Sequence, residues 1–342
     1  MKSTRTLLRF LALEQLLPAL ESGEETLVGG QAVMEGVMMR TPHAWGIAVR
    51  NSGGELVVHN EPLERPSEKH KWLGWPFIRG LVTLGQAMGL GFRALKFSAN
   101  VALDDPELKN EKGEKFELNG WVMAANVIFS LGFFILMYKF LPLVAATEIQ
   151  RHYTALNNRM VFSLVDGAFR VAIFLLFLWL ISRPKDIRRI FEYHGAEHKT
   201  VFACEDGKEL TIAEAQRYST FHPRCGTSFL MTVMLISIAI YALVPATTFW
   251  GKLGARIALL PVIASVSYEM IRLGSHLRRK AADGSKVPLW RSGLFVALTR
   301  PGMWLQRITT QPPADGQIEC AISALNAAFV LEKQRGGELI IA

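Results

Sequence analysis

The sequence predicts a mainly α-helical membrane protein with four transmembrane helices and a small β-rich cytoplasmic subdomain near the N-terminus. Half of its 342 residues are hydrophobic, and its mean hydropathy of +0.21 is high for a soluble enzyme. Four apolar segments have about the length that a helix needs to cross a bilayer, roughly 20 residues. A large soluble protein can bury one such helix in its core, but four in one chain favour a membrane.

The expected transmembrane helices cover residues 121–146, 160–182, 227–250 and 257–273. The first contains one charged residue, Lys139, and the third contains none. The fourth is shorter and contains both a proline and a glutamate. We therefore expect a membrane domain over residues 119–273, in which a long loop at 183–226 joins the second and third helices.

The distribution of Lys and Arg predicts the orientation of these helices. The loops at 148–159 and 251–256 contain two basic residues each, whereas segment 183–226 contains eight. Because basic residues concentrate in cytoplasmic loops, we expect segment 183–226 and both termini to lie in the cytoplasm. The formal net charge of +8 then reflects basic loops at an anionic lipid surface, not nucleic-acid binding. Three widely spaced cysteines fit reduced thiols in the cytosol.

Four further regions are expected outside the four helices. Residues 1–27 read as an amphipathic helix, and residues 28–70 as the β-rich subdomain, with a hairpin signal at 51–54 between two strand-like runs. Residues 72–103 have apolar positions at helical spacing, interrupted by arginine and lysine, which suits either an interfacial or a re-entrant helix. Residues 274–342 form a cytoplasmic tail that mixes basic patches with an apolar stretch.

The strongest functional signal is His194-Gly-Ala-Glu197-His198, in the expected cytoplasmic loop. Apolar residues around it recur at helical spacing, so both imidazoles lie on one side of a helix, with Glu197 beside them. This is the H-x-x-E-H order in which two histidines bind Zn²⁺ and the carboxylate transfers protons. The competing interpretation is a pair of ordinary core histidines.

A second stretch of the sequence strengthens the interpretation of this motif as a metal site. His222 and Cys225 have the spacing of a metal knuckle, and Cys225 lies where the third transmembrane helix begins, a position that favours the metal-binding thiolate. Together the two stretches read H-x₃-H-x₂₃-H-x₂-C, a ligand set that suits Zn²⁺ better than Mg²⁺ or Ca²⁺. The alternative is that His222 is an ordinary loop histidine and Cys225 an unreactive buried thiol.

These residues predict a zinc-dependent hydrolase at the cytoplasmic membrane interface. His194, His198, His222 and Cys225 would hold the metal, and Glu197 would be the general base for cleavage of an amide or ester-like bond. The alternative is a non-enzymatic scaffold or assembly factor with a structural zinc site, because four protein ligands usually close a structural site. A metal transporter is a weaker third option, since transporter sites lie near the bilayer midplane. The bilayer is the one partner the sequence indicates; it predicts neither a substrate nor an oligomeric state.

Ionisable residues inside the expected helices give weaker signals. Asp166 and Arg170 lie one helical turn apart near the outer end of the second helix, and we expect them to pair while snorkelling towards water. Glu269, near the inner end of the fourth helix, is a further candidate ligand or base.

Several motifs resemble the YqhQ-like family of bacterial integral membrane proteins. They are Gly29-Gly-Gln-Ala-Val-Met-Glu35-Gly-Val-Met-Met-Arg40, Phe77-Ile-Arg-Gly80, Glu192-Tyr-His-Gly-Ala-Glu-His-Lys199, His222-Pro-Arg-Cys-Gly-Thr-Ser228 and Trp304-Leu-Gln-Arg-Ile-Thr-Thr310. The resemblance covers about residues 28–330 and implies a multi-pass protein of the bacterial cytoplasmic (inner) membrane. Members are commonly labelled metal-dependent enzymes of unknown function, which implies a metal but no substrate. The first motif also contains Gln31 and Glu35; Glu35 would be either a further ligand or part of a tight β-turn, and we favour the turn.

Overall fold

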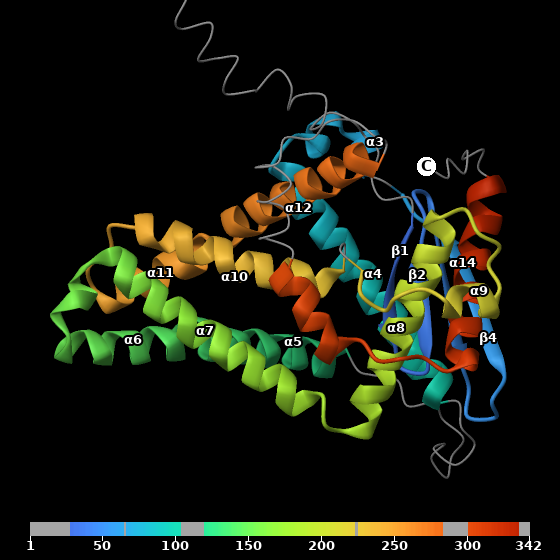
Figure 1. Ribbon diagram of the computed structural model, residues 1–342, viewed down its shortest axis with the longest axis horizontal. Coiled ribbons are helices and arrows are strands. Elements are labelled where there is room, and N and C mark those ends of the chain that lie inside the picture. The colour runs from blue at the N-terminus through green and yellow to red at the C-terminus, as the bar shows by residue number, and fades with distance from the viewer. Residues whose placement is uncertain (1–27, 65, 104–119, 223–224, 283–299, 335–342) are drawn as a thin grey trace, which may run out of the picture.

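The computed structural model describes residues 28–64, 66–103, 120–222, 225–282 and 300–334. It is mainly helical, with one four-stranded sheet near the N-terminus. In Figure 1 the sheet lies at one end with helices α8, α9 and α14 around it, while the apolar helices extend away from it to the other end. The expected mainly α-helical protein with a small β-rich subdomain is thus confirmed in outline.

The sheet is an antiparallel meander in the order β1-β2-β3-β4. Its strands are β1 (Gly29–Val33), β2 (Gly36–Arg40), β3 (Ala44–Arg50) and β4 (Leu56–Pro62). The expected hairpin at 51–54 joins β3 to β4, where Gly54 has a φ of +84° that a glycine adopts without strain. Glu35, with a φ of +52°, forms the tight turn between β1 and β2, as the sequence favoured.

Alternate residues of the strands supply two separate cores. On one face Val37, Met39 and Ala48 pack with residues of α8 (Lys185–Glu205) and α14 (Asp315–Gln334). On the other face Met38 and Ile47 pack with the second half of α4 (Ile78–Leu103). This alternation follows from the two-residue period of a strand, and both faces are buried because a helix covers each.

Helix α14 contains the apolar stretch that the sequence placed in a cytoplasmic tail. It contacts β2, β3 and β4, and its backbone approaches β3 so closely that a Cβ added at Gly46 would lie 2.8 Å from the backbone nitrogen of Ala328. The C-terminal part of the described chain therefore completes the core of the N-terminal sheet.

The apolar helices agree with a membrane protein of three or four spans. Residues 128–152, α7 (Arg159–Ile181) and α10 (Gly226–Leu243) are each long and apolar enough to cross a bilayer. The first is built from the end of α5 (Gly120–Ile135), the π-helical turn η3 (Leu136–Phe140) and α6 (Leu141–His152). Helices α11 (Phe249–Ala258) and α12 (Leu260–Ala282) are bent by 49° and count as a fourth span only if taken together.

The third helix is shorter than expected. Helix α10 ends at Leu243, not at residue 250, and the chain is extended at Val244 with φ −74° and ψ 123°. The reason is Pro245, because a proline disfavours the helical conformation of the residue before it. Residues 251–256, expected as a loop, are helical and belong to α11.

Helix α4 confirms the helical part of the interpretation of residues 72–103, and it contacts α12 as well as β1 and β3. Whether it lies at the interface or re-enters the bilayer stays a prediction, as do the domain boundaries. The expected N-terminal helix at 1–27, and residues 283–299 and 335–342 of the expected tail, lie outside the described residues.

Two ionisable residues differ from expectation. Arg170 pairs with Asp166 as expected, but it is only 2 % exposed and does not snorkel outwards; it also donates to Ser237 on α10. Glu269 accepts two hydrogen bonds from Arg79 on α4, at 2.8 and 2.6 Å. A carboxylate engaged in this way fastens α4 to α12, so we drop Glu269 as a candidate ligand or base.

Candidate metal centre

Helix α8 places the two histidines of the H-x-x-E-H motif next to each other. The ring centroids of His194 and His198 lie 4.4 Å apart, as expected for side chains one helical turn apart. The motif lies in the buried half of α8, where Glu197 is 7 % and His198 is 2 % exposed. The polar first turns of α8 remain exposed to solvent, so burial begins where the motif does.

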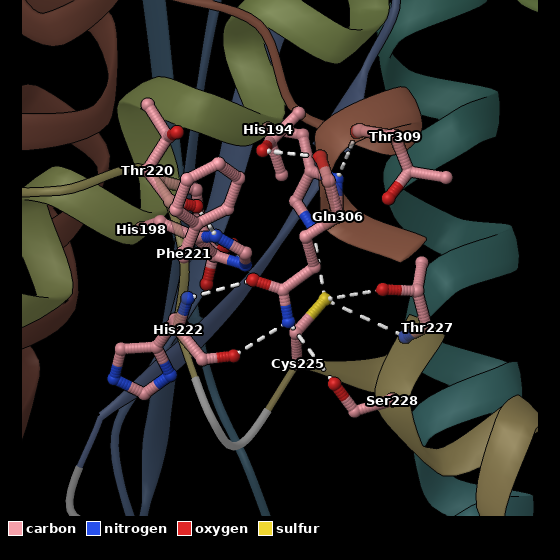
Figure 2. A network of polar contacts seen from close by, with 12 residues as sticks. His194, His198, Thr220, Phe221, His222, Cys225, Thr227, Ser228, Gln306 and Thr309 are labelled. Atoms are coloured by element: carbon pink, nitrogen blue, oxygen red, sulfur yellow. Dashed lines mark hydrogen bonds and ion pairs between the residues drawn. The ribbon is translucent and has the colours of Figure 1, made fainter. Parts of the chain in front are cut away.

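The third residue of the centre comes from the start of α10. Cys225 is the N-cap of that helix, and its Sγ accepts a hydrogen bond from the backbone N–H of Thr227. The same sulfur lies 3.2 Å from Nε2 of His194 (Figure 2). The ligand atoms of His194, His198 and Cys225 all lie within 4.8 Å of one another. Zn²⁺ bonds of about 2.0–2.3 Å set tetrahedral ligands roughly 3.5 Å apart, so only small side-chain adjustments separate this arrangement from a ligand set.

Backbone carbonyls orient both imidazoles. Nδ1 of His194 lies 2.8 Å from the carbonyl oxygen of Thr309, and Nδ1 of His198 lies 2.5 Å from that of Thr220 (Figure 2). Because a carbonyl only accepts, each Nδ1 carries the proton and each Nε2 keeps its lone pair, the arrangement common to metal-binding histidines. Nε2 of His198 is buried and has no hydrogen-bond partner among the described residues. Such an orphaned atom is rare in a folded protein, and a metal ion would satisfy it.

Burial sets the protonation of the site. Desolvation lowers the pKa of His198, which keeps the imidazole neutral and able to bind a metal. Desolvation also raises the pKa of the Glu197 carboxyl, while His194, His222 and the backbone N–H of Gly30 act in the opposite direction. A carboxyl shifted upward is a better proton acceptor near neutral pH than an ordinary glutamate.

Glu197 lies beside the three ligands and against strand β1. Its Oε2 is 3.6 Å from Nε2 of His198. A Cβ added at Gly30 would lie only 2.6 Å from Cγ of Glu197, so β1 needs a glycine there to let the carboxylate in. Gly30 thus has a packing role at the site.

His222 is the one expected ligand that the structure does not bring into the group of three. Its ring lies 5.6 Å from that of His198 but is directed away from Sγ of Cys225 (Figure 2). Its Nε2 is 3.5 Å from Oε2 of Glu205. Its ring would have to turn to reach the other ligands. Its role as a fourth ligand stays a prediction.

Gln306, in the helical residues 300–309, was not found as a site residue from the sequence. It is fully buried, accepts from the backbone N–H of His222 at 2.8 Å and donates to the carbonyl of His222 at 2.7 Å and to Ser228 at 3.0 Å. It therefore fixes the backbone on both sides of Cys225. Only its place in one of the family motifs pointed to it.

A cavity of about 260 Å³ opens beside the centre. Its wall includes His194, Glu197, His198, His222 and Cys225, together with residues of β1, β2 and α4. Gln31 is part of this wall, whereas Glu35 instead binds Arg189 and Tyr193 and so holds the β1–β2 turn against α8. Ligand atoms and a carboxylate facing one cavity are what a metal-assisted reaction needs.

The helices and the buried His/Cys cluster describe a membrane protein with a candidate metal centre at one end of its spans. Residues 75–331 match the family described as "Protein of unknown function (DUF1385)". The chain is also 31 % identical over 309 residues to "Uncharacterized protein YqhQ" of Bacillus subtilis (strain 168), covering 89 % of this chain and 92 % of that relative. The chain therefore belongs to this YqhQ-like family, as the motifs indicated. No solved structure matches it.

Proposed function

We propose that the protein is a zinc-dependent hydrolase of the cytoplasmic membrane, with its site at the cytoplasmic face. The observation that carries the proposal is the convergence of His194, His198 and Cys225 around the orphaned Nε2 of His198, with Glu197 beside it. The basic residues of segment 183–226 support the cytoplasmic placement.

The three residues fit zinc better than Mg²⁺ or Ca²⁺. Two neutral imidazoles and a thiolate form a borderline-soft set, whereas Mg²⁺ and Ca²⁺ prefer oxygen ligands. Three protein ligands leave one tetrahedral position open, which is typical of catalytic zinc. Bound there, zinc would lower the pKa of a water molecule to about 7.

Glu197 would accept the proton that hydrolysis releases. Its carboxyl is buried, faces the cavity and has a raised pKa, three properties of a general base. The close packing of β1 at Gly30 holds the carboxylate in place. The reaction class that fits these residues is cleavage of a peptide or other amide or ester-like bond at the membrane surface.

The test is Glu197→Gln in the purified full-length protein, with metal content and hydrolysis of a panel of fluorogenic peptides and esters measured together. We expect unchanged zinc and a fall in rate of at least about 100-fold, because general-base catalysis contributes about 10²–10⁴. Glu209→Gln, at an exposed glutamate just beyond the end of α8, is the matched control and should retain both. Loss of the metal from Glu197→Gln would make Glu197 a ligand and overturn its role as base.

A structural zinc site is the second candidate, because one observation favours it. His194 and His198 belong to α8, which packs on the sheet, whereas Cys225 begins α10, an apolar helix. A metal there would fasten the sheet to the membrane helices. In that case Glu197→Gln should change nothing, zinc removal should increase hydrogen exchange throughout α8, and His222 should complete a four-ligand set.

A further inference from the structure

A second cavity is lined by residues of α6, α7, α10 and α11. These helices meet at the end of the molecule farthest from the sheet (Figure 1). The cavity has a volume of about 180 Å³. Three basic residues line it: Arg159 at the start of α7, and Lys252 and Arg256 on α11. The wall also includes the polar side chains of Gln150, Ser163 and Tyr241.

Positive charge is also in excess directly behind this wall. Lys139 and Arg170 are buried there, at 4 % and 2 % exposure, and they surround the ring of Tyr241 together with Arg256, at 5.5, 5.1 and 5.5 Å. Among the described residues, Asp166 is the one carboxylate that forms an ion pair with any of these three cations, and it pairs with Arg170 and Arg256 only.

Asp166 cannot balance this charge. Its Oδ2 accepts a hydrogen bond from Arg170, and its Oδ1 accepts one of 2.8 Å from Arg256. Nζ of Lys139 instead reaches the hydroxyl of Tyr241 at 3.1 Å, and Nε of Arg170 finds no acceptor among the described residues. Cation–π contacts stabilise a charge far less than it costs to hold that charge unbalanced inside a membrane protein. An anion in the adjoining cavity would supply the missing negative charge.

We propose that this cavity binds a phosphate group, either as the free ion or as the headgroup of a phospholipid. Arginine and lysine are the residues that bind phosphate most strongly. The volume is below the range of about 300–1,000 Å³ that drug-sized ligands occupy, so it suits a small oxyanion or one headgroup. The ammonium of Lys252 is positioned 3.8 Å from the centre of the Phe162 ring and 3.4 Å from Oε1 of Gln150, at the cavity wall.

The phosphate site is separate from the metal centre. Cys225 caps the first turn of α10, whereas Tyr241 and Val244 line the cavity at the other end of the same helix. Eighteen helical residues separate the two ends, which is about 27 Å at 1.5 Å per residue. The two sites therefore lie at opposite ends of α10, and each can be tested without disturbing the other.

The test is thermal unfolding of the purified full-length protein in detergent, titrated with four additives. Potassium phosphate is compared with potassium chloride at equal ionic strength, and phosphatidylglycerol is compared with diacylglycerol, which lacks the phosphate. We expect saturable stabilisation by phosphate, by phosphatidylglycerol or by both, but by neither control. Stabilisation by phosphate identifies the free ion as sufficient; stabilisation by phosphatidylglycerol alone identifies the lipid headgroup.

Variants of residues in the cavity wall test whether the stabilisation arises from binding in this cavity. Lys252→Gln should raise the half-saturating concentration about tenfold, because a hydrogen bond to a charged group is worth at least about 1.5 kcal/mol. Arg159→Gln should do the same, and it decides the matter if the first variant does not fold. Arg151→Gln on α6, an exposed cation that pairs with Glu148 and does not line the cavity, should behave as wild type. No stabilisation, or an equal loss in Arg151→Gln, would overturn the proposal.

Discussion

Nε2 of His194 lies 3.2 Å from Sγ of Cys225, although the two residues are 31 positions apart in the sequence. The contact joins α8, which packs on the sheet, to the first turn of α10, which belongs to the apolar helices. It brings two motifs with metal-ligand spacing to one point, and the proposed zinc site depends on it.

The thiol of Cys225 should be needed for metal binding. Cys225→Ser is expected to lower zinc content at a fixed zinc concentration at least tenfold, because an alcohol binds zinc far more weakly than a thiolate. Elemental analysis of the purified protein measures it. Cys204→Ala is the matched control: Cys204 lies in the core cluster of α8, α14 and the sheet, and it is not one of the three residues whose ligand atoms converge. Equal zinc in Cys225→Ser and wild type would remove Cys225 from the site.

Gln306 should act on the metal through the backbone it holds. Gln306→Ala removes both hydrogen bonds to His222 and the one to Ser228, so Cys225 loses its fixed position. We expect zinc affinity to fall about 10–100-fold, as when residues that orient metal ligands are removed. Competition with a chelator measures the affinity. Gln334→Ala, an exposed glutamine at the end of α14, is the control; an unchanged affinity in Gln306→Ala would assign Gln306 to folding alone.

Asp166 should be among the most sensitive positions in the membrane helices. Asp166→Asn leaves Arg170 and Arg256 buried without a counter-charge, and breaking such a buried pair costs about 3–5 kcal/mol. Chemical unfolding in detergent micelles measures the loss. Glu148→Gln breaks an exposed ion pair on α6 and should remain close to wild type. If both variants are equally stable, the buried network contributes nothing to stability.

Glu332 should make the packing of α14 on the sheet sensitive to acid. Burial alone would raise the pKa of its carboxyl, but hydrogen bonds from His43 and Thr41 outweigh burial and lower it. Because the pKa of Glu332 is lower in the folded state than in the unfolded chain, its ionised carboxylate stabilises the fold at pH values above the ordinary pKa of 4.5. This stabilisation is lost as the pH falls through the lowered pKa.

Hydrogen exchange of the α14 amides tests this assignment. We expect the protection factors of the wild type to decrease as the pH is lowered from about 5 to 3. In Glu332→Gln that decrease should be smaller, and protection at neutral pH should be lower. Identical pH profiles in the two proteins would show that Glu332 is not the group responsible.

Local patterns predicted the parts of the site that lie on single elements. Helical spacing placed His194, Glu197 and His198 on one side of α8, and the apolar run after Cys225 predicted the helix that it caps. Gln306 and the carbonyls of Thr220 and Thr309 were not predictable in this way. Their contacts join segments far apart in the chain, and a backbone carbonyl has no residue-specific signal.

The fold shows the same division between local and distant information. The strands and the long helices follow from alternation, apolar length and turn residues. The packing of α14 on β3 joins segments about 270 residues apart. The apolar pattern of neither segment indicates which partner it packs against. Arg256 was counted among the basic residues of a loop, because the third helix was expected to end at residue 250 and the fourth to begin at residue 257. In the structure α10 ends at Leu243, and Arg256 lies on α11 as a buried partner of Asp166. The pairing of Asp166 with Arg170 was predictable, since it is one helical turn long.

The most direct measurement is metal analysis combined with X-ray absorption spectroscopy on the purified protein, comparing wild type with His198→Ala. We expect one zinc per wild-type chain, with one sulfur and at least two imidazole nitrogens bound to it, and loss of that zinc in His198→Ala. A wild-type protein without metal, a metal without a sulfur neighbour, or full retention of zinc in His198→Ala would contradict it.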